Sequence, residues 1–449
     1  MAGKKTQAQL TLEEKLQQAL IPEAEQPYKV PTNWCWTFIR YVSHVVTGGT
    51  PSKKHTEYYG GNFPFFKPVD LNSGRHVYNA SEYLSEAGKN ISCMIPKYST
   101  LVCCIGSIGK SGYLEIDGTT NQQINSAIPK FDSLYLYYFI NTNYFIIQLL
   151  QKASATTISI VNKTKMENCF FPLPPLAEQQ RIVERIESLF AKLDEAKENL
   201  QNVLDGFETR KAAILHKAFT GELTSNWRKQ HGISMDSWEE KPLKDLTDVI
   251  GDGIHGTPIY TENGEYYFIN GNNFSGVEIR IKQETKRVNH IEYDKYKVNL
   301  NDKTVFVSIN GTLGKTAFYN NEKIILGKSA CYLNLKENLN KFYLRYFFCS
   351  KEFIDYANEK ATGSTIKNLG LKAIRNLIIF VPPIPEQTEI VRIIDDLLAK
   401  EQQAKELAEN ALAKIDLIKK SILAHAFRGE LGTNNPADEP AVELLKRVL

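Results

Sequence analysis

The sequence predicts an α+β protein built as an internal tandem repeat, in which two mixed α/β domains are separated by a pair of long antiparallel coiled-coil helices. Two observations predict this fold class. The stretch Pro174-Pro175-Leu176-Ala177-Glu178-Gln179 returns as Pro382-Pro383-Ile384-Pro385-Glu386-Gln387, and a long helical pattern follows each copy. Each pattern ends on the same A-F-x-G-E-L sequence, at residues 218–223 and 426–431.

The first long helix carries a heptad seam. Its apolar residues recur in alternating steps of four and three, which is the period of a coiled coil. They are Ile182, Ile186, Leu189, Leu193, Ala196, Leu200, Val203, Phe207 and Ile214. The preceding proline pair suits a helix start, and Gly221 suits its end. About 44 residues at 1.5 Å each predict a rod of roughly 65 Å.

The second long helix repeats this seam without a gap, at a shift of 208 positions from Pro174 to Pro382. One slot differs, because Glu401 stands where the first copy has Leu193. The second helix is alanine-rich in its middle, so large residues of one helix can pack against small ones of the other. An antiparallel return would bury both seams and relate the two copies by a pseudo-two-fold axis. The alternative is two unrelated surface helices.

The repeat divides the chain into seven parts. We predict a leader at 1–30, a first globular domain at 31–173, a first spacer helix at 174–220, a linker at 221–237, a second globular domain at 238–381, a second spacer helix at 382–428 and a tail at 429–449. The leader contains a short helix from Thr11 to Leu20, where Thr11 and Glu14 have the form of a capping box.

Composition excludes several classes of protein. The chain has 449 residues, 42% of them hydrophobic and 23% charged, which is the balance of two or three globular domains. No apolar run is long enough for a membrane helix and residues 1–20 have no apolar signal core, so we expect a cytoplasmic protein. The seven cysteines form no C-x-x-C pair, which argues against a zinc site and a disulfide framework.

The two globular domains share landmarks but not the residues between them. Trp34, Trp36 and Phe38 alternate as in a strand, residues 101–105 form an apolar strand that runs into Gly106-Ser107-Ile108-Gly109-Lys110, and residues 134–150 predict one helix. In the second domain, Gly256-Thr257-Pro258 corresponds to Gly49-Thr50-Pro51 of the first. Residues 305–315 repeat the apolar strand and the glycine turn of residues 101–110. Similar frames with different loops are expected of two domains that bind different targets.

Three patterns that suggest catalysis fail on inspection. Gly106 to Ser111 and Gly311 to Thr316 resemble a phosphate-binding loop, but each lacks the first glycine and is followed by a strand pattern rather than a helix. A tight hairpin that displays a lysine is the better interpretation. Glu195-Ala196-Lys197 has a nuclease-like E-x-K spacing but lies within the coiled-coil pattern. The sequence therefore predicts no catalytic residue, no metal site and no cofactor on this chain.

The loops of both domains combine cations with amides, as DNA-binding surfaces do. Lysine and arginine hold phosphates, while asparagine and glutamine can read base edges by paired hydrogen bonds. The formal net charge of +3 allows a local basic groove but is too small to establish one. A solvated charged face is the alternative for each residue. The candidates are Lys53, Lys54, Lys67, Arg75 and Lys110 in the first domain and Asn270, Asn272 and Lys315 in the second.

Taken together, these motifs resemble the specificity (S) subunits of type I restriction-modification systems over nearly the whole chain. The two P-P-[LI]-x-E-Q segments with their helices carry the resemblance, as do Gly49-Thr50-Pro51, the turn at residues 106–110 and Asn121-Gln122-Gln123. The second domain departs from the pattern, because it has no clear Asn-Gln-Gln. The shared landmarks add Thr50, Ser107, Asn121, Gln122, Thr257 and Thr312 to the DNA-binding candidates.

The resemblance implies a non-catalytic subunit that binds double-stranded DNA. Each recognition domain would read one half of a bipartite target while the helices set the unread gap. Two methyltransferase subunits, which use S-adenosylmethionine, and restriction-motor subunits, which use ATP and magnesium, would be the partners. The competing hypothesis is a coiled-coil adaptor whose two end domains bind proteins. Neither the bases of the target nor the length of its gap follows from the sequence, because no code links these loops to bases.

Overall fold

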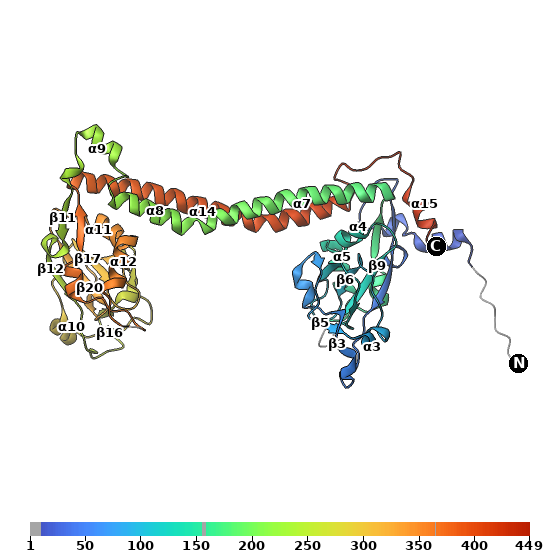
Figure 1. Ribbon diagram of the computed structural model, residues 1–449, viewed down its shortest axis with the longest axis horizontal. Helices are drawn as coiled ribbons and strands as arrows, with labels where there is room; N and C mark the ends of the chain where they lie inside the picture. The colour runs from blue at the N-terminus through green and yellow to red at the C-terminus, as the bar shows by residue number, and fades with distance from the viewer. Residues whose placement is uncertain (1–9, 155–158, 364) are drawn as a thin grey trace. The chain divides into compact units, whose positions relative to one another are not determined.

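The computed structural model describes residues 10–154, 159–363 and 365–449, and its internal contacts divide it into two units. Unit 1 comprises residues 1–199 and 410–449, and unit 2 comprises residues 200–409. Each unit combines one mixed α/β domain with segments of both long helices (Figure 1). The first nine residues of the predicted leader lie outside the described residues.

The centre of unit 1 is a five-stranded sheet in the order β2-β9-β6-β7-β4. These strands are β2 (Ser43–Thr47), β9 (Ile124–Pro129), β6 (Thr100–Cys103), β7 (Ser111–Leu114) and β4 (His76–Val77). Val102 of β6 packs with the helices, while Leu101 and Cys103 pack into a second cluster on the other face. Burial of both faces explains why this strand reads as an unbroken apolar run.

Two smaller sheets and several helices complete unit 1. The sheets are β5-β3-β8, with β3 (Tyr59–Phe66), β5 (Glu82–Leu84) and β8 (Thr119–Thr120), and β1-β10, with β1 (Cys35–Phe38) and β10 (Phe170–Leu173). The shorter helices are α1 (Leu12–Ala19), α2 (Ile39–Val42), α3 (Glu86–Asn90), α4 (Ser133–Ile140), α5 (Asn143–Lys152), α6 (Lys163–Glu167) and α15 (Ala441–Lys446). The predicted capping box of α1 is confirmed, because Thr11 and Glu14 bond each other's backbone N–H groups.

The prediction of one helix over residues 134–150 is wrong. α4 ends at Ile140 and α5 begins at Asn143. The hydroxyl of Thr142 accepts a hydrogen bond from the Phe145 N–H at 3.1 Å, so Thr142 is the N-cap of a new helix. The sequence pattern did not indicate this cap, because the apolar and aromatic residues of the stretch 134–150 continue on both sides of it.

Unit 2 repeats the central pairing of unit 1 with a different periphery. Its main sheet has the order β12-β20-β17-β18, with β12 (Thr247–Asp252), β20 (Ala330–Leu335), β17 (Thr304–Ser308) and β18 (Thr316–Phe318). β17 pairs with β18 and β20 as β6 pairs with β7 and β9. Both glycine turns therefore close hairpins, which confirms that a strand and not a helix follows each of them.

Among the described residues of unit 2, three smaller sheets and five short helices accompany the main sheet. The sheets are β16-β13-β19, with β16 (Arg287–Val288), β13 (Tyr266–Ile269) and β19 (Ile324–Leu326); β11-β21, with β11 (Glu239–Pro242) and β21 (Ile378–Val381); and β14-β15, with β14 (Phe274–Ser275) and β15 (Glu278–Ile279). The helices are α9 (Ser225–His231), α10 (His290–Tyr296), α11 (Lys341–Phe348), α12 (Lys351–Lys360) and α13 (Leu371–Arg375).

The predicted first spacer helix consists of α7 (Leu176–Asp205) and α8 (Phe207–Phe219), which meet at Gly206, and the second is α14 (Ile384–Ala426). The backbone of Gly206 remains helical, and its N–H still donates to the Asn202 carbonyl at 3.1 Å. A Cβ at Gly206 would lie 2.4 Å from a guanidinium nitrogen of Arg210, so glycine leaves room for that side chain.

The two long helices run in opposite directions inside each unit. In unit 1, Asp194 of α7 pairs with Lys419 of α14, and the ammonium of Lys419 lies over the Phe190 ring. In unit 2, Arg210 of α8 donates to Glu401 of α14 at 2.7 Å. This ion pair explains why a glutamate occupies the heptad slot that the sequence pattern reserved for an apolar residue.

The repeated Glu-Gln pair fixes each domain to its helix. In unit 2 the carboxylate of Glu386 is fully buried and accepts hydrogen bonds from Trp238 Nε1 at 3.0 Å, from Arg228 at 2.6 Å and from Thr224 at 2.6 Å. The next residue, Gln387, accepts a hydrogen bond from the Asn340 N–H, and Asn340 is the N-cap of α11. A buried carboxylate requires such donors to offset its lost hydration.

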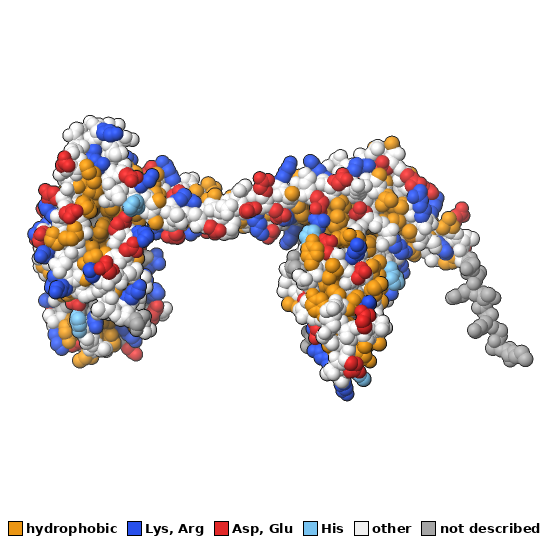
Figure 2. Space-filling model, viewed as in Figure 1, with side chains coloured by type: hydrophobic (Ala, Val, Ile, Leu, Met, Phe, Trp, Pro, Cys, Tyr) orange, Lys and Arg blue, Asp and Glu red, His pale blue; other side chains and the backbone are white. Residues whose placement is uncertain are grey.

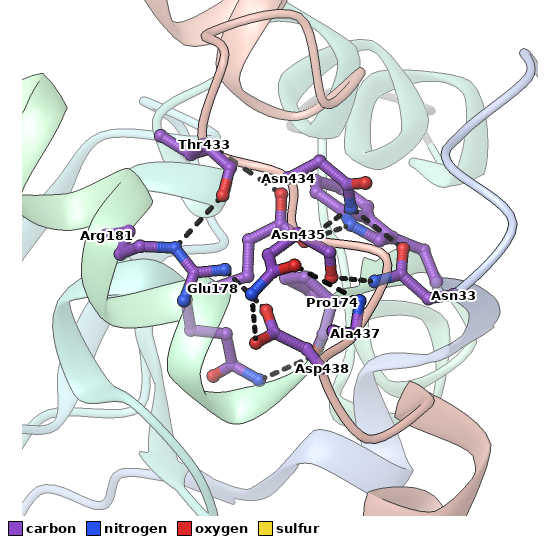
Figure 3. A network of polar contacts seen from close by, with 11 residues as sticks. Asn33, Pro174, Glu178, Arg181, Thr433, Asn434, Asn435, Ala437 and Asp438 are labelled. Atoms are coloured by element: carbon purple, nitrogen blue, oxygen red, sulfur yellow. Dashed lines mark hydrogen bonds and ion pairs between the residues drawn. The ribbon is translucent and has the colours of Figure 1, made fainter.

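In unit 1 the C-terminal tail donates hydrogen bonds to the carboxylate at the equivalent position (Figure 3). Glu178, also fully buried, accepts from Trp34 Nε1 at 2.8 Å, from the Asn434 amide at 2.8 Å and from the Thr433 hydroxyl at 3.4 Å. Arg181 reinforces the tail by donating to the Thr433 carbonyl and pairing with Asp438. A cation therefore reaches the buried carboxylate in unit 2, whereas neutral groups surround it in unit 1.

Each domain is also capped by the helix end that belongs to the other repeat. Phe427, just past α14, packs its ring 4.9 Å from Tyr135 and 5.3 Å from Phe139 of α4. Phe219, at the end of α8, lies 5.2 Å from Tyr343 and 5.3 Å from Phe347 of α11. The A-F-x-G-E-L sequences therefore recur because their phenylalanines fill the same pocket in the two units.

The difference between the two buried carboxylates predicts unequal costs of neutralisation. Glu386→Gln leaves either Trp238 or buried Arg228 facing an amide NH₂, so we expect a loss of about 3–5 kcal/mol in the free energy of unfolding. In Glu178→Gln the amide oxygen can keep the Trp34 and Asn434 bonds while its NH₂ donates to the Thr433 hydroxyl, which predicts a loss of about 1 kcal/mol. Urea denaturation of the two variants measures both losses. Equal losses would contradict the assignment.

Candidate nucleic-acid interface

In unit 1, the loop at residues 48–54 packs against the turn that follows β8. Gly48 makes this possible, because a Cβ there would lie 2.3 Å from the Asn121 carbonyl oxygen. The Gly49 N–H donates to the Thr120 carbonyl at 2.9 Å, and the Thr50 hydroxyl donates to the side-chain oxygen of Gln122. The structure therefore brings two predicted residues, Thr50 and Gln122, into direct contact on an exposed edge.

The neighbouring candidates divide into exposed and buried groups. Lys53 and Lys54 are exposed on the same loop, and Ser107 is exposed in the β6–β7 turn. Asn121 is buried instead, and its amide bonds both the backbone N–H and the side chain of Gln123 at 3.1 Å. Asn121 therefore shapes the turn that presents Gln122.

Three of the predicted DNA-binding cations of unit 1 already have protein partners. Lys67 forms an ion pair with Glu82 at 2.7 Å, and Lys110 donates to the Pro68 carbonyl and to Asn72. Arg75 forms an ion pair with Glu187 of α7, which also accepts a hydrogen bond from Tyr138. These side chains hold the domain together, a use that spacing in the sequence does not reveal.

Burial and charge keep the Tyr138 hydroxyl in its donor form. Desolvation raises its pKa most, and its hydrogen bond to Glu187 raises it further. The phenol therefore remains protonated and donates to the carboxylate. Arg75, Tyr138 and Glu187 together attach α4 to α7.

In unit 2 the predicted amides lie at a short helical turn after β13. The Asn270 side chain accepts a hydrogen bond from the Asn272 N–H at 2.9 Å, and the Asn270 N–H donates to the Asn273 side chain at 3.0 Å. Asn270 therefore shapes the turn, while Asn272 is exposed. Thr257 is exposed on the loop that follows β12.

The β17–β18 turn displays the other two candidates of unit 2. The Ser308 hydroxyl donates to the Thr312 carbonyl at 2.6 Å and accepts from the Lys315 N–H at 2.9 Å. Gly311 and Gly314 take the left-handed conformation that this turn requires, with φ of 74° and 80°. Thr312 and Lys315 consequently lie exposed at its tip.

Asn272 and Lys315 line a common hollow of about 560 Å³ in unit 2. Three further cations line it, namely Lys211 of α8 and Arg280 and Lys282 after β15. Arg280 and Lys282 belong to the basic loops that the sequence indicated, whereas Lys211 was not selected. Lys211 was overlooked because it lies in the coiled-coil pattern, far along the chain from the loops.

Across the visible faces, basic and acidic side chains are interspersed rather than gathered into one basic field (Figure 2). Among the described residues no group of three or more His, Cys, Asp or Glu side chains could hold a metal ion. No helix in the described part of the chain is long and apolar enough to cross a membrane.

Comparisons with family models and with known proteins point to the same family. The model of the type I restriction modification DNA specificity domain matches twice, at residues 31–205 and 235–410. The chain is 25% identical over 447 residues to the specificity subunit of the type I restriction enzyme StySPI from Salmonella potsdam, and 22% identical over 435 residues to that of EcoKI from Escherichia coli K12. Each alignment covers 92% of both proteins.

A solved structure has the same fold. The crystal structure of the HsdS subunit from Thermoanaerobacter tengcongensis superposes with a TM-score of 0.64 at 19% sequence identity, over 91% of this chain and 100% of that one.

Proposed function

Because two matches to its model span most of the sequence, the chain belongs to the type I restriction-modification DNA specificity family, and we propose that it reads a bipartite DNA target with one recognition domain per half. The observation that carries the proposal is the repeated frame with different loops. The β6–β7 and β17–β18 hairpins correspond, but Asn121-Gln122-Gln123 has no counterpart in unit 2. Two frames of one kind with unlike surfaces suit two unlike half-sites.

The exposed candidates are assigned to this reading surface. In unit 1 they are Thr50, Lys53, Lys54, Ser107 and Gln122, and in unit 2 they are Thr257, Asn272, Thr312 and Lys315. Amides and hydroxyls can pair with base edges, whereas the lysines position the phosphate backbone. Lys67, Arg75 and Lys110 are not assigned to it, because their side chains already have ion pairs or hydrogen bonds with groups of the protein.

The helices are proposed to set the unread gap between the half-sites. We infer that α7 with α8 and α14 form one antiparallel coiled-coil pair with a pseudo-two-fold axis. Support comes from Asp194 with Lys419 in unit 1 and from Arg210 with Glu401 in unit 2, which have the same antiparallel sense. The 43 residues of α14 correspond to roughly 65 Å of helix.

The chemistry is assigned to partner subunits. The curated relatives are named as specificity subunits of type I restriction enzymes. We therefore propose two methyltransferase subunits that use S-adenosylmethionine and restriction-motor subunits that use ATP and magnesium. The pseudo-two-fold axis would point the two recognition domains at opposite strands, so that adenines of both strands become methylated.

Genome-wide mapping of methylated adenine tests the bipartite reading. Cells that express the chain with its methyltransferase partner should gain methylation at one split motif, with two defined halves and a fixed gap. An assembled complex that adds no methylation to the genome would contradict the proposal and favour a protein-binding coiled-coil adaptor.

A second prediction concerns the gap. Inserting four residues near Thr220, where α8 ends, should lengthen the unread gap and leave both half-sites unchanged, because four residues that extend the helix add about 6 Å along its axis. Methylation mapping reads the result. Four residues inserted at the exposed segment 261–263 serve as the control, and should leave the gap unchanged. A first insertion that altered a half-site would contradict the spacer model.

A further inference from the structure

The hollow of unit 2 that contains Asn272 and Lys315 is unusual in charge. Its lining includes Lys211, Arg280, Lys282 and Lys315, and none of the residues that line it is aspartate or glutamate. Arg345 adds a fifth cation at the rim, since its guanidinium lies 3.6 Å from where a Cβ of Gly276 would be. The Nε atom of Arg345 is buried and has no hydrogen-bond partner among the described residues.

The cations of this hollow have little to neutralise them. Toward the described residues, the side chains of Lys211, Arg280 and Lys315 make no hydrogen bond or ion pair. Lys282 reaches only Glu284, at 3.8 Å, and both side chains are more than half exposed, so this pair contributes little. Like charges that face one hollow repel each other unless an anion enters.

Unit 1 uses the corresponding cations differently. The shift of 208 that relates the helices (Pro174 to Pro382) places Lys419 at the position of Lys211, and Lys419 pairs with Asp194. Lys110 follows the glycine turn of unit 1 as Lys315 follows that of unit 2, and Lys110 donates to Pro68 and Asn72. The same framework therefore leaves cations free of partners in unit 2 and occupies them in unit 1.

We propose that this hollow binds a backbone phosphate of duplex DNA, held by Lys211, Arg280 and Lys315. The inference rests on the proposed function and deepens it. The hollow is open, and about 560 Å³ holds a phosphodiester with part of its sugars. Lys211 lies on helix α8 and not on a recognition loop, so the contact positions the duplex without reading its sequence.

The proposal makes the two units unequal in their electrostatic contribution. Each phosphate contact releases counterions and adds about 0.9 to the slope of log affinity against log salt. At this position of the repeat, unit 2 should therefore supply a salt dependence that unit 1 does not. The bases that the protein recognises should not depend on this phosphate contact.

The test uses the full chain with its methyltransferase partner and a duplex that carries its mapped motif. Affinity is measured between about 50 and 200 mM salt for Lys211→Gln, Arg280→Gln, Lys315→Gln and the triple variant. Because the site holds one phosphate, the triple variant should reduce the slope by about 0.9 and lower affinity about eightfold near 0.1 M salt. Each single change should cause part of this loss, and the methylated motif should stay the same in every variant.

Lys217→Gln is the matched control, because Lys217 is exposed on the same helix and does not line the hollow. It should leave affinity and slope unchanged. A triple variant with the wild-type slope overturns the phosphate site and leaves the proposed function intact. A wild-type complex that binds no DNA overturns the proposed function, and this inference with it.

Cys349 supplies an independent readout, because it is exposed and lines the hollow. Bound duplex should slow its alkylation several-fold, while exposed Cys93 of unit 1 should react at the same rate with and without DNA. Mildly alkaline conditions suit the assay, because desolvation raises the pKa of the Cys349 thiol. Unchanged reactivity of Cys349 in a complex shown to be DNA-bound would contradict the site.

Discussion

The architecture depends on one buried carboxylate at the start of each long helix. Glu178 and Glu386 are fully buried, and each accepts the indole N–H of a tryptophan that opens a recognition domain. A buried carboxylate is tolerated only where several donors converge on it, so its position fixes the angle at which the domain leaves the helix. The glutamine that follows each carboxylate accepts a hydrogen bond from the N-cap residue of α4 or α11, so the Glu-Gln pair aligns two elements at once.

This constraint also explains why the two ends of the chain differ. In unit 2 the linker completes the site with Arg228, whereas in unit 1 the tail completes it with Asn434. Because Phe427 and Phe219 cap the domain of the opposite repeat, each domain requires sequence from both copies. The reading surfaces are then free to differ, since the parts that repeat are those that hold each domain in place.

Much of the frame could be predicted from the sequence, because it is encoded locally. The heptad seam, the capping box of α1 and the two glycine hairpins each follow from residues a few positions apart. The partners of Glu178 could not be predicted, because Asn434 lies more than 250 positions away. Contacts between distant positions also limit what the sequence says about the interface. Arg75 resembled a DNA contact in the sequence, but it pairs with Glu187. Lys211 resembled a solvated coiled-coil residue, but it lines a hollow.

The central claim is that each recognition domain is held by the helix end of the other repeat. Hydrogen exchange of Phe427→Ala and Phe219→Ala tests it most directly, because exchange reports each unit separately. The account predicts that Phe427→Ala speeds amide exchange in α4 and leaves α11 unchanged, and that Phe219→Ala does the reverse, since each change empties one aromatic cluster. Faster exchange in the domain of the same repeat as the mutated phenylalanine would contradict it.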